Sequence, residues 1–449
     1  MRTVAAARPP GPELSPFAGL RAFRRDPIGL LERAARYGDV AYLRLPRTDT
    51  YLINDPELVW ELFVTRARHV GKGPTIRASR LMLGEGLLTS EEPAHRRQRL
   101  LLNPLFHHDR LSVYGETMVD HALAVAERWR DGENIDVHRE MARLTLGVVA
   151  STIFAIELGS NDTATVTGAL TEILAMFDRI YSPLFPVTIR LPIPSTVRFR
   201  RRRAEIDRIV LRLIAERRAS GAGGDDLLSL LIRAQEGGEG LSDRQVRDQA
   251  LTLFLAGHET TANALAWTWW FLAGHPEAEE DLHEELDRVL AERRPGVADL
   301  AALPYTDAVI LEAIRLRPPA WAIGRTALER FELGGFEVAA GSVLVVSPYL
   351  LDRDERWFPD ALAFRPERWL EERPPRGAFV PFGAGPRQCI GEGFARMEAR
   401  LVLATLARGW RFRRPPGPEP ALHPSITLRP RHGIPMALDR RGGGSQILG

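Results

Sequence analysis

Cys389 is the only cysteine in this chain of 449 residues, and it lies in a glycine-rich stretch near the C-terminal end. Glycines stand on both sides of it, at Gly383, Gly385, Gly391 and Gly393. Because glycine tolerates positive φ and close approach, this composition predicts a tight loop that can lie against a flat ligand. A lone cysteine is otherwise read as a small buried hydrophobic residue, so its surroundings must decide between packing and chemistry.

The chemistry that the position of Cys389 favours is metal binding by a thiolate. An apolar pattern of helical period at residues 394–406 predicts a helix that begins shortly after the cysteine. Unpaired N–H groups and the positive end of the helix dipole stabilise a thiolate placed at such a start. The sulfur can therefore stay ionised and bind iron.

A second set of unusual residues lies inside a long apolar stretch. Gly257, His258, Glu259 and Thr260 interrupt a helical pattern that extends over residues 242–273. Glycine costs about 1 kcal/mol relative to alanine in a helix, and polar groups that are buried need partners. These residues form either a polar stripe that faces water or part of an internal site. A lone helical histidine such as His258 is more often packed or solvated than a ligand.

The elements that must position these residues are mostly helices. Ser242 and Gln245 resemble a capping box, and a helix of about thirty residues extends roughly 45–50 Å, long enough to cross the molecule. Residues 425–428 and 434–438 predict a closing hairpin. Other short strand-like runs are predicted at residues 39–45, 51–53, 331–338 and 341–347. The pattern predicts a mainly α protein with small β-sheets.

The loop around Cys389 resembles the heme-binding signature of the cytochrome P450 family, Phe-x-x-Gly-x-Arg-x-Cys-x-Gly. The matching residues are Phe382, Gly385, Arg387, Cys389 and Gly391. The resemblance implies heme b with Cys389 as the iron ligand, held by a loop that includes Phe382, Gly383 and Gly391. It extends over about residues 27–438 and implies a single domain, with the heme between the long central helix and the Cys loop. Residues 1–26 are then a flexible segment and residues 439–449 a disordered tail.

Residues 256–261 resemble the oxygen-activation motif of the same family, small-Gly-x-acid-Thr-Thr. The resemblance implies that Gly257 leaves room for dioxygen, while Glu259 and Thr260 organise water and relay protons. The implied activity is a monooxygenase that inserts oxygen into a C–H or C=C bond of its substrate. A peroxide-using or rearranging heme-thiolate enzyme and a heme sensor remain alternatives, although neither typically requires the acid–threonine pair.

The resemblance implies a role for each of two further groups of charged residues. His95 and Arg99 are four residues apart, so they share one face of a helix and can donate to one anion, although such a face is more simply solvated. The resemblance implies that they hold a heme propionate, as do Arg325 and Arg387. The other group is Glu312, Arg315 and Arg368. An exposed pair of this kind contributes only about 0–1 kcal/mol, but the resemblance implies that these three residues form a structural network.

The residues expected to line a substrate pocket are mostly apolar, so the substrate is predicted to be hydrophobic. They are Ile76, Leu81, Phe177, Leu253, Ala256, Ala320, Trp321, Ala322, Ile323 and Ile426. No arginine stands out as an anchor for a carboxylate. The overall pattern is similar to that of terpene-oxidising bacterial members, so a terpenoid is the first expectation and a fatty acid or polyketide the second.

Residues 182–194 are apolar and proline-rich, and the arginines Arg198 and 200–203 follow them. We favour a lid over a hydrophobic substrate entrance. The alternative is a surface that dips into a membrane and has basic support.

The composition limits the possible partners and compartments. The 60 basic and 58 acidic residues nearly cancel, so no global field favours nucleic acid. A single cysteine excludes an internal disulfide framework, and the reducing cytoplasm is the default location. Residues 1–20 contain no apolar run that could span a bilayer, so no transmembrane anchor is expected.

The source of electrons must be a separate protein, because no glycine-rich dinucleotide fingerprint follows a predicted strand. We expect electrons to pass from NAD(P)H through a ferredoxin or flavodoxin with its reductase. Arg96, Arg97, Arg396 and Arg400 form either a basic face that receives an acidic donor or a solvated surface.

Overall fold

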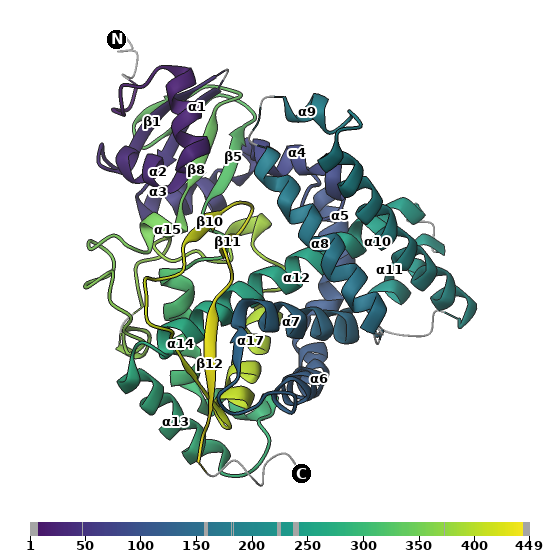
Figure 1. The fold of residues 1–449 in the computed structure, drawn as a ribbon. Coiled ribbons are helices and arrows are strands. Elements are labelled where there is room, and N and C mark those ends of the chain that lie inside the picture. The colour runs from purple at the N-terminus through teal and green to yellow at the C-terminus, as the bar shows by residue number, and fades with distance from the viewer. Residues whose placement is uncertain are drawn as a thin grey trace. The chain divides into compact units, whose positions relative to one another are not determined.

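The computed structural model describes residues 8–442 except residues 47, 157–159, 181, 183, 222–225, 237–241 and 372. The described chain is predominantly helical and has small sheets, as the sequence predicts (Figure 1). It divides into two compact units. The first unit contains Met1–Ala78, Arg315–Ala363 and Glu372–Cys389, and the second contains Ser79–Ile314, Phe364–Glu371 and Ile390–Gly449.

The first unit is built on a five-stranded sheet with the order β1-β2-β8-β5-β3. Only the β2–β8 pair is parallel within this sheet. Its core is aliphatic and aromatic, and the Val-Leu-Val-Val sequence of β8 suits a half-buried pleated surface. The strands of this unit are β1 (Val40–Leu45), β2 (Thr48–Ile53), β3 (Val70–Lys72), β5 (Ile323–Ala327), β6 (Phe331–Leu333), β7 (Phe336–Val338) and β8 (Val343–Val346).

Short helices accompany this sheet in the chain. They are α1 (Pro16–Arg25), α2 (Pro27–Ala35), α3 (Pro56–Trp60), η1 (Glu61–Thr65), η2 (Ala67–His69), α15 (Pro348–Leu351) and η5 (Gly385–Arg387). Helix α1 lies within the segment that the sequence predicted to be flexible. The Ser15 hydroxyl accepts a hydrogen bond from the Ala18 N–H, and Pro16 occupies the first turn. Proline therefore helps to start this helix instead of excluding one.

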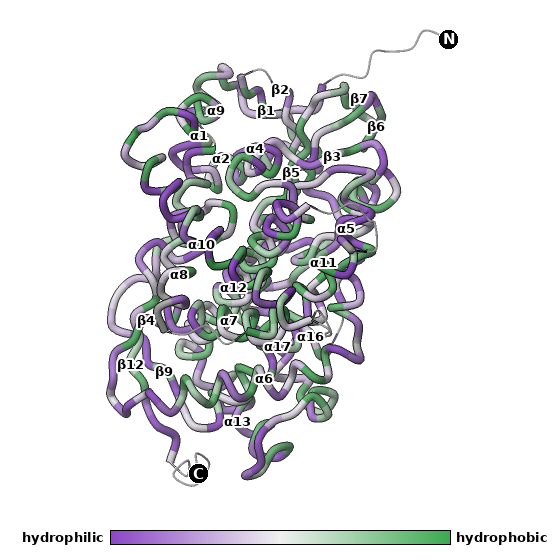
Figure 2. The backbone as a smooth tube through the Cα atoms, turned by 90° about the vertical axis from the view of Figure 1, so that its right-hand side faces the viewer, coloured by the Kyte–Doolittle hydropathy of each residue, from purple (hydrophilic) through white to green (hydrophobic). Residues whose placement is uncertain are grey.

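The second unit consists mostly of helices, with α12 (Asp243–Leu272) packed along α7 (Val137–Ile153). In the same unit α17 (Glu392–Ala407) packs on α6 (His108–Ala126), and α10 (Pro194–Ala219) packs on α8 (Ser160–Ile180). Figure 1 shows α12 running beside α7 and α17. Hydrophobic and hydrophilic stretches alternate along the helices drawn in Figure 2, as expected for helices with one buried face, whereas α12 is buried on nearly all sides from Ala250 to Leu272.

The remaining elements of the second unit are shorter or lie at its edge. The helices are α4 (Pro74–Leu83, which begins in the first unit), α5 (Ala94–Leu102), η3 (Asn103–Phe106), α9 (Phe185–Thr188), α11 (Leu227–Glu236), α13 (Pro276–Leu290), η4 (Val297–Ala302), α14 (Pro304–Leu316, which ends in the first unit) and α16 (Arg368–Glu371). The strands are β4 (Asn134–Asp136), β9 (Trp410–Arg413), β10 (Leu422–Pro424), β11 (Leu428–Pro430) and β12 (Pro435–Arg440).

The C-terminal strands differ from the predicted hairpin. β11 pairs with β10, whereas β12 pairs with β9 and β4, so the two runs predicted to pair with each other belong to different sheets. The predicted tail also begins too early, because β12 continues to Arg440. The rest of that tail, from residue 443, lies outside the described residues.

The long helix follows the sequence closely. α12 contains 30 residues, and the capping box is formed: the Gln245 N–H donates to the Ser242 hydroxyl at 3.3 Å, and the Ser242 N–H donates to the Gln245 side chain at 2.8 Å. None of the helices within the described residues is long and apolar enough to cross a membrane.

Candidate functional site

The Cys loop is held by its own backbone in the first unit. The Cys389 N–H donates to the Phe382 carbonyl at 2.8 Å and closes the loop. Gly383 and Gly385 have φ values of 69° and 71°, and a Cβ at Gly385 would collide with the Phe63 carbonyl oxygen. These two positions therefore require glycine. Cys389 itself is exposed and forms no disulfide.

The other two glycines of the loop do not have the predicted backbone conformation. Gly391 has φ −93° and caps α17, which begins three residues after Cys389, and Gly393 also lacks a positive φ. A Cβ at Gly393 would lie 3.1 Å from a methyl group of Leu111 on α6. Helix packing explains Gly393 better than turn geometry does. Arg387 ends the short 3-10 turn of the loop and is partly exposed.

A small exposed face interrupts the burial of α12. From Ala250 to Leu272 every residue is buried except Ala256, Gly257 and Thr260. These three residues lie at positions i, i+1 and i+4 and so share one side of the helix. The Thr260 hydroxyl donates to the Ala256 carbonyl at 2.7 Å, within the same face. The interpretation as a water-facing polar stripe is wrong, because the face consists mainly of small residues.

Gly257 also has a packing role. A Cβ at this position would lie 2.8 Å from a methyl group of Val149 on α7. Real Cβ contacts are essentially never this short, so the glycine permits the close approach of α12 and α7. Nothing in this contact concerns dioxygen, and the predicted role of Gly257 beside the iron stays a prediction.

Glu259 is buried and held by hydrogen bonds. Its Oε1 accepts from the Asn263 side chain at 3.2 Å and from the Thr427 hydroxyl at 3.1 Å. Burial acts to raise the pKa of Glu259, but the nearby His258, His138 and Arg429 and the bond from Asn263 outweigh it and lower the pKa. Sequence reasoning missed Asn263 and Thr427. Asn263 could have been found, because it is four residues after Glu259 on the same helix.

His258 belongs to the packing of α12. Its Nδ1 lies 2.7 Å from the Phe254 carbonyl, and its own carbonyl accepts from the Thr145 hydroxyl of α7 at 3.0 Å. Burial lowers the pKa of His258, and the neighbouring Glu259 carboxylate opposes that shift.

Glu398 is a further buried acid that sequence reasoning missed. It lies on α17, and within the described part of the chain neither carboxyl oxygen has a hydrogen bond that meets ordinary geometry. Burial raises the pKa of Glu398 well above its usual value, and a small opposing effect comes from Thr261 on α12. This carboxyl is therefore protonated where an ordinary glutamate would be charged.

The His95–Arg99 pair lies on α5, as its spacing predicts. His95 is buried, and its Nδ1 lies 3.0 Å from Glu92 Oε1. Arg99 is one turn further along and partly exposed.

Arg325 and Lys72 form an unusual pair of cations in the first unit. Arg325 on β5 lies directly across from Lys72 on β3, and both are buried. The Arg325 guanidinium stacks 4.8 Å from the Phe63 ring and donates to the Gly324 carbonyl at 3.1 Å. Sequence reasoning missed Lys72, although it is the only lysine among 60 basic residues.

The predicted structural network is fully buried, so the interpretation as surface decoration is wrong. Glu312 pairs with Arg368 at 3.0 Å and accepts from the Trp369 indole N–H at 2.9 Å. Arg315 donates to the carbonyls of Asp352 and Ala361, each at 2.6 Å, and to a third carbonyl at Ala363.

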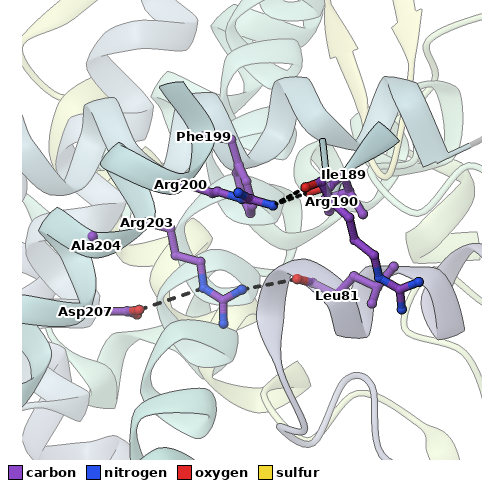
Figure 3. A pocket seen from close by; sticks show the side chains of 8 residues that line it. All are labelled: Leu81, Ile189, Arg190, Phe199, Arg200, Arg203, Ala204 and Asp207. Carbon is purple, nitrogen blue, oxygen red and sulfur yellow. Dashed lines mark hydrogen bonds and ion pairs between the residues drawn. The ribbon is translucent and has the colours of Figure 1, made fainter. Parts of the chain in front are cut away.

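The predicted pocket residues differ in their surroundings. Phe177, Leu253 and Trp321 are buried, whereas Ala256 is exposed. Those that are partly exposed are Ile76, Ala320, Ala322, Ile323 and Ile426. Leu81 lines a pocket of about 260 Å³ formed with α9 and α10 (Figure 3), and none of the other nine residues lines it.

The predicted basic face is only partly available. Arg96 and Arg97 are exposed on α5. Arg396 pairs with Asp307 at 2.6 Å, and Arg400 donates to the Leu300 carbonyl while burial lowers its pKa. Two of the four arginines are therefore engaged within the second unit.

Comparison with known proteins gives the class of this chain. A model of the family described as Cytochrome P450 matches residues 9–435, so the chain belongs to the cytochrome P450 family. It is similar to cyclooctatin synthase of Streptomyces melanosporofaciens, with 39% identity over 92% of this chain and 91% of that protein. It is 38% identical to cyclooctat-9-en-7-ol 5-monooxygenase of the same organism, over 88% of this chain and 87% of that protein.

Two further relatives support the same class. Pentalenene oxygenase of Streptomyces avermitilis is 36% identical, over 86% of this chain and 87% of that protein. The crystal structure of CYP175A1 from Thermus thermophilus has a TM-score of 0.77 and 31% identity, and the match covers 94% of this chain and 97% of that chain. These findings confirm the family and the fold class. Cytochrome P450 proteins are oxidoreductases that use heme b and receive electrons from NAD(P)H through redox partners.

Proposed function

We propose that this protein is a heme-thiolate monooxygenase that hydroxylates or epoxidises a hydrophobic small molecule, first of all a terpenoid. The observation that carries the proposal is the small exposed face of Ala256, Gly257 and Thr260 on a helix that is otherwise buried. An exposed Cys389 in a loop that carries the complete heme signature supports it.

The side chains fit heme b in their chemistry. Cys389 supplies the thiolate, and Phe382, Gly383 and Gly391 belong to the loop that would lie against the macrocycle. His95, Arg99, Arg325 and Arg387 would bind the propionates, and we add Lys72, which lies directly across from Arg325 in the sheet. When bound, a heme with a thiolate ligand activates dioxygen for insertion into C–H or C=C bonds.

The proton path would use Thr260 and Glu259. Because the Thr260 hydroxyl donates its hydrogen to the Ala256 carbonyl, its oxygen remains able to accept a hydrogen bond from a water on the exposed face. Glu259 is fixed by Asn263 and Thr427, and its lowered pKa keeps it ionised, so it would orient water by accepting hydrogen bonds.

The substrate proposal rests on the apolar residues and on the relatives. Every proposed lining residue is apolar, so a neutral terpenoid fits better than the carboxylate of a fatty acid. Pentalenene and cyclooctat-9-en-7-ol, which appear in the names of two relatives, are cyclic terpenoids. We place the enzyme in the cytoplasm, where NAD(P)H and a ferredoxin or flavodoxin with its reductase can supply electrons.

Two spectroscopic experiments test the proposal. The reduced, CO-treated protein should show the red-shifted band of a thiolate-ligated heme, and Cys389→Ser should lose that band. If the substituted protein kept it, the ligand assignment would be wrong. Cyclic terpene hydrocarbons and alcohols should then shift the iron spin state at micromolar concentration, whereas long-chain fatty acids should not. A shift with fatty acids alone would reject the substrate class but leave the monooxygenase intact.

A further inference from the structure

An apolar surface patch surrounds the short helix α9 in the second unit. Its residues, called the α9 patch below, are Leu184, Val187, Leu191 and Val197, and their exposed fractions lie between 45% and 64%. The opposite side of the same segment already supplies the core, because Phe185 and Ile189 are buried. A lid over an apolar entrance would need its inward side to be apolar. The outward aliphatic side chains require a different explanation.

Arginines border the α9 patch in the segment that follows α9 and on the adjoining half of α10. The cations are Arg190, Arg198, Arg200, Arg201, Arg202 and Arg203, and the carboxylates that contact them are Glu172, Glu205 and Asp207. Six positive charges against three negative ones leave this surface strongly basic. The charge is local, because the whole chain carries a net charge of only +2.

A pocket between α4, α9 and α10 collects three of these guanidinium groups (Figure 3). Arg200 donates to the carbonyls of Ile189 and Arg190 at 3.0 and 2.9 Å, so neutral acceptors leave its charge uncompensated. Arg203 donates to the Leu81 carbonyl at 3.1 Å and lies 3.8 Å from Asp207. The side chain of Arg190 is exposed, and no described residue forms a hydrogen bond or ion pair with that side chain.

Asp207 is the one carboxylate among the residues that line this pocket, against three arginines. It lies 3.8 Å from Arg203 and 3.4 Å from Arg247, and Arg247 also pairs with Asp248 at 3.2 Å. The lining therefore keeps a net positive charge. Burial is the main cause that lowers the pKa of Arg203; the neighbouring Arg247 lowers it further, while Asp207 and Asp248 oppose the shift. The pocket is therefore suited to an anionic oxygen group such as a phosphate.

We propose that the α9 patch and the bordering arginines dock this protein on the surface of an anionic lipid bilayer, with a lipid phosphate between Arg190, Arg200 and Arg203. The aliphatic side chains would enter the acyl boundary while the guanidinium groups bind head groups. Neither signal alone holds a protein firmly on a membrane, but an apolar contact combined with basic residues does.

Other occupants fit this surface less well. A second copy of the chain would bring the same basic border against itself, so charge repulsion opposes a symmetric dimer here. Protein interfaces are enriched in aromatic residues at their centre, whereas the α9 patch is entirely aliphatic. The docking does not depend on the proposed monooxygenase activity. A bilayer in which a terpenoid dissolves would nevertheless bring such a substrate close to the enzyme.

Vesicle sedimentation of the full-length heme-loaded protein tests the proposal. Vesicles of phosphatidylcholine with about a third phosphatidylglycerol should bind the protein at low ionic strength, and pure phosphatidylcholine vesicles should bind it weakly. Leu184→Ser with Val187→Ser should weaken binding about tenfold or more. Arg190→Gln should weaken it roughly fivefold and reduce its sensitivity to salt. These side chains are exposed, so the variants should keep their fold.

Matched substitutions elsewhere provide the controls. Leu362→Ser removes a leucine that is even more exposed than Leu184, and Arg128→Gln removes an exposed arginine, and both variants should bind vesicles like the original protein. Failure to bind anionic vesicles, or equal loss in the control variants, would overturn the proposal. Binding of inorganic phosphate without vesicle binding would mean a soluble anion site only. If an acidic polypeptide such as polyglutamate bound while vesicles did not, the patch would be a protein interface. Each result leaves the spectroscopic tests of the heme site unaffected.

Discussion

Thr260 differs from the other polar residues around it because it alone belongs to the exposed face of α12. Glu259 and Thr261 point into packed surroundings, where Asn263, Thr427 and Glu398 are their neighbours. At the scale of single residues, water can therefore reach the Thr260 hydroxyl, whereas Glu259 and Thr261 are buried against neighbouring side chains.

Replacing Thr260 tests this separation directly. We expect Thr260→Ala to raise peroxide release per NAD(P)H several-fold, because proton delivery to the reacting oxygen would be lost, while Thr260→Ser should restore most of the coupling. Thr268→Ala is the matched control, since the Thr268 hydroxyl makes the same bond one turn back, to the Ala264 carbonyl at 2.8 Å, but is buried. Coupling that is unchanged in Thr260→Ala, with a substrate that shifts the spin state, would argue against the relay.

Glu398 predicts a pH-dependent stability. Its pKa is raised in the folded state, so the proton is bound more tightly there than in the unfolded chain. That contribution is complete below the ordinary pKa of 4.5 and is lost as the pH rises toward the folded value. Glu398→Gln should therefore become more stable relative to the original protein as the pH rises from 4 to 8, because the amide has no proton to lose. Thermal unfolding at both pH values measures this, and a pH-independent difference would contradict it.

At the scale of elements, the contact between α12 and α7 depends on the absence of a side chain at Gly257. The sequence analysis predicted that Gly257 leaves room for dioxygen, but the side chain that a Cβ there would meet first is Val149. Helix propensity alone would favour alanine at this position by about 1 kcal/mol. The packing of α12 against α7 therefore outweighs the intrinsic preference of the helix for alanine.

A double-mutant cycle separates the two explanations for Gly257. Gly257→Ala should cost about 1–2 kcal/mol of unfolding free energy, because the new Cβ displaces a stiff β-branched side chain. Combined with Val149→Ala, the same substitution should become nearly neutral or stabilising relative to Val149→Ala alone. Denaturant unfolding midpoints provide the measurement. An equal cost in both backgrounds would mean that the glycine does not serve this packing contact.

Helix α12 could be predicted from local signals, whereas the pairing of distant strands could not. The capping box at Ser242 and Gln245 lies within one turn and indicated where the helix begins. The apolar periodicity that follows it indicated how far the helix extends. The β10–β11 and β9–β12–β4 pairings join segments whose short strands carry no marker of their partners. Glu398 shows the same limit in the site, because its burial depends on how α17 packs on α12. The heme signature was predictable because its residues are close in the chain.

At the scale of the whole molecule, charge is distributed very unevenly although the total is nearly zero. The basic surface beside α9 and the arginines of α5 are separate features of the second unit, and each calls for its own anionic partner. Of the four arginines of the predicted basic face, only Arg96 and Arg97 on α5 remain fully available, because Arg396 and Arg400 on α17 contact α14 and the η4 segment.

The rate of electron transfer should depend on the arginines of α5 and not on the basic surface beside α9. We expect the rate of reduction by an acidic ferredoxin to fall steeply with ionic strength, because docking by charge is screened within about 10 Å at 0.1 M salt. Arg96→Gln with Arg97→Gln should slow reduction severalfold at low salt, whereas Arg198→Gln, on the arginine border of α9, should not. Stopped-flow reduction across a salt series measures both, and a rate independent of salt would exclude charge-guided docking.

The buried position of Lys72 has a practical consequence for chemical labelling. Because the chain contains one lysine, a reagent specific for side-chain amines has a single target, and that target is covered in the strand that pairs with β5. Modification of Lys72 would then require β3 to separate from its neighbour, so the rate of acylation would report how often this edge of the sheet opens. The protein thus carries a natural one-site probe of its own local unfolding, with no engineered tag.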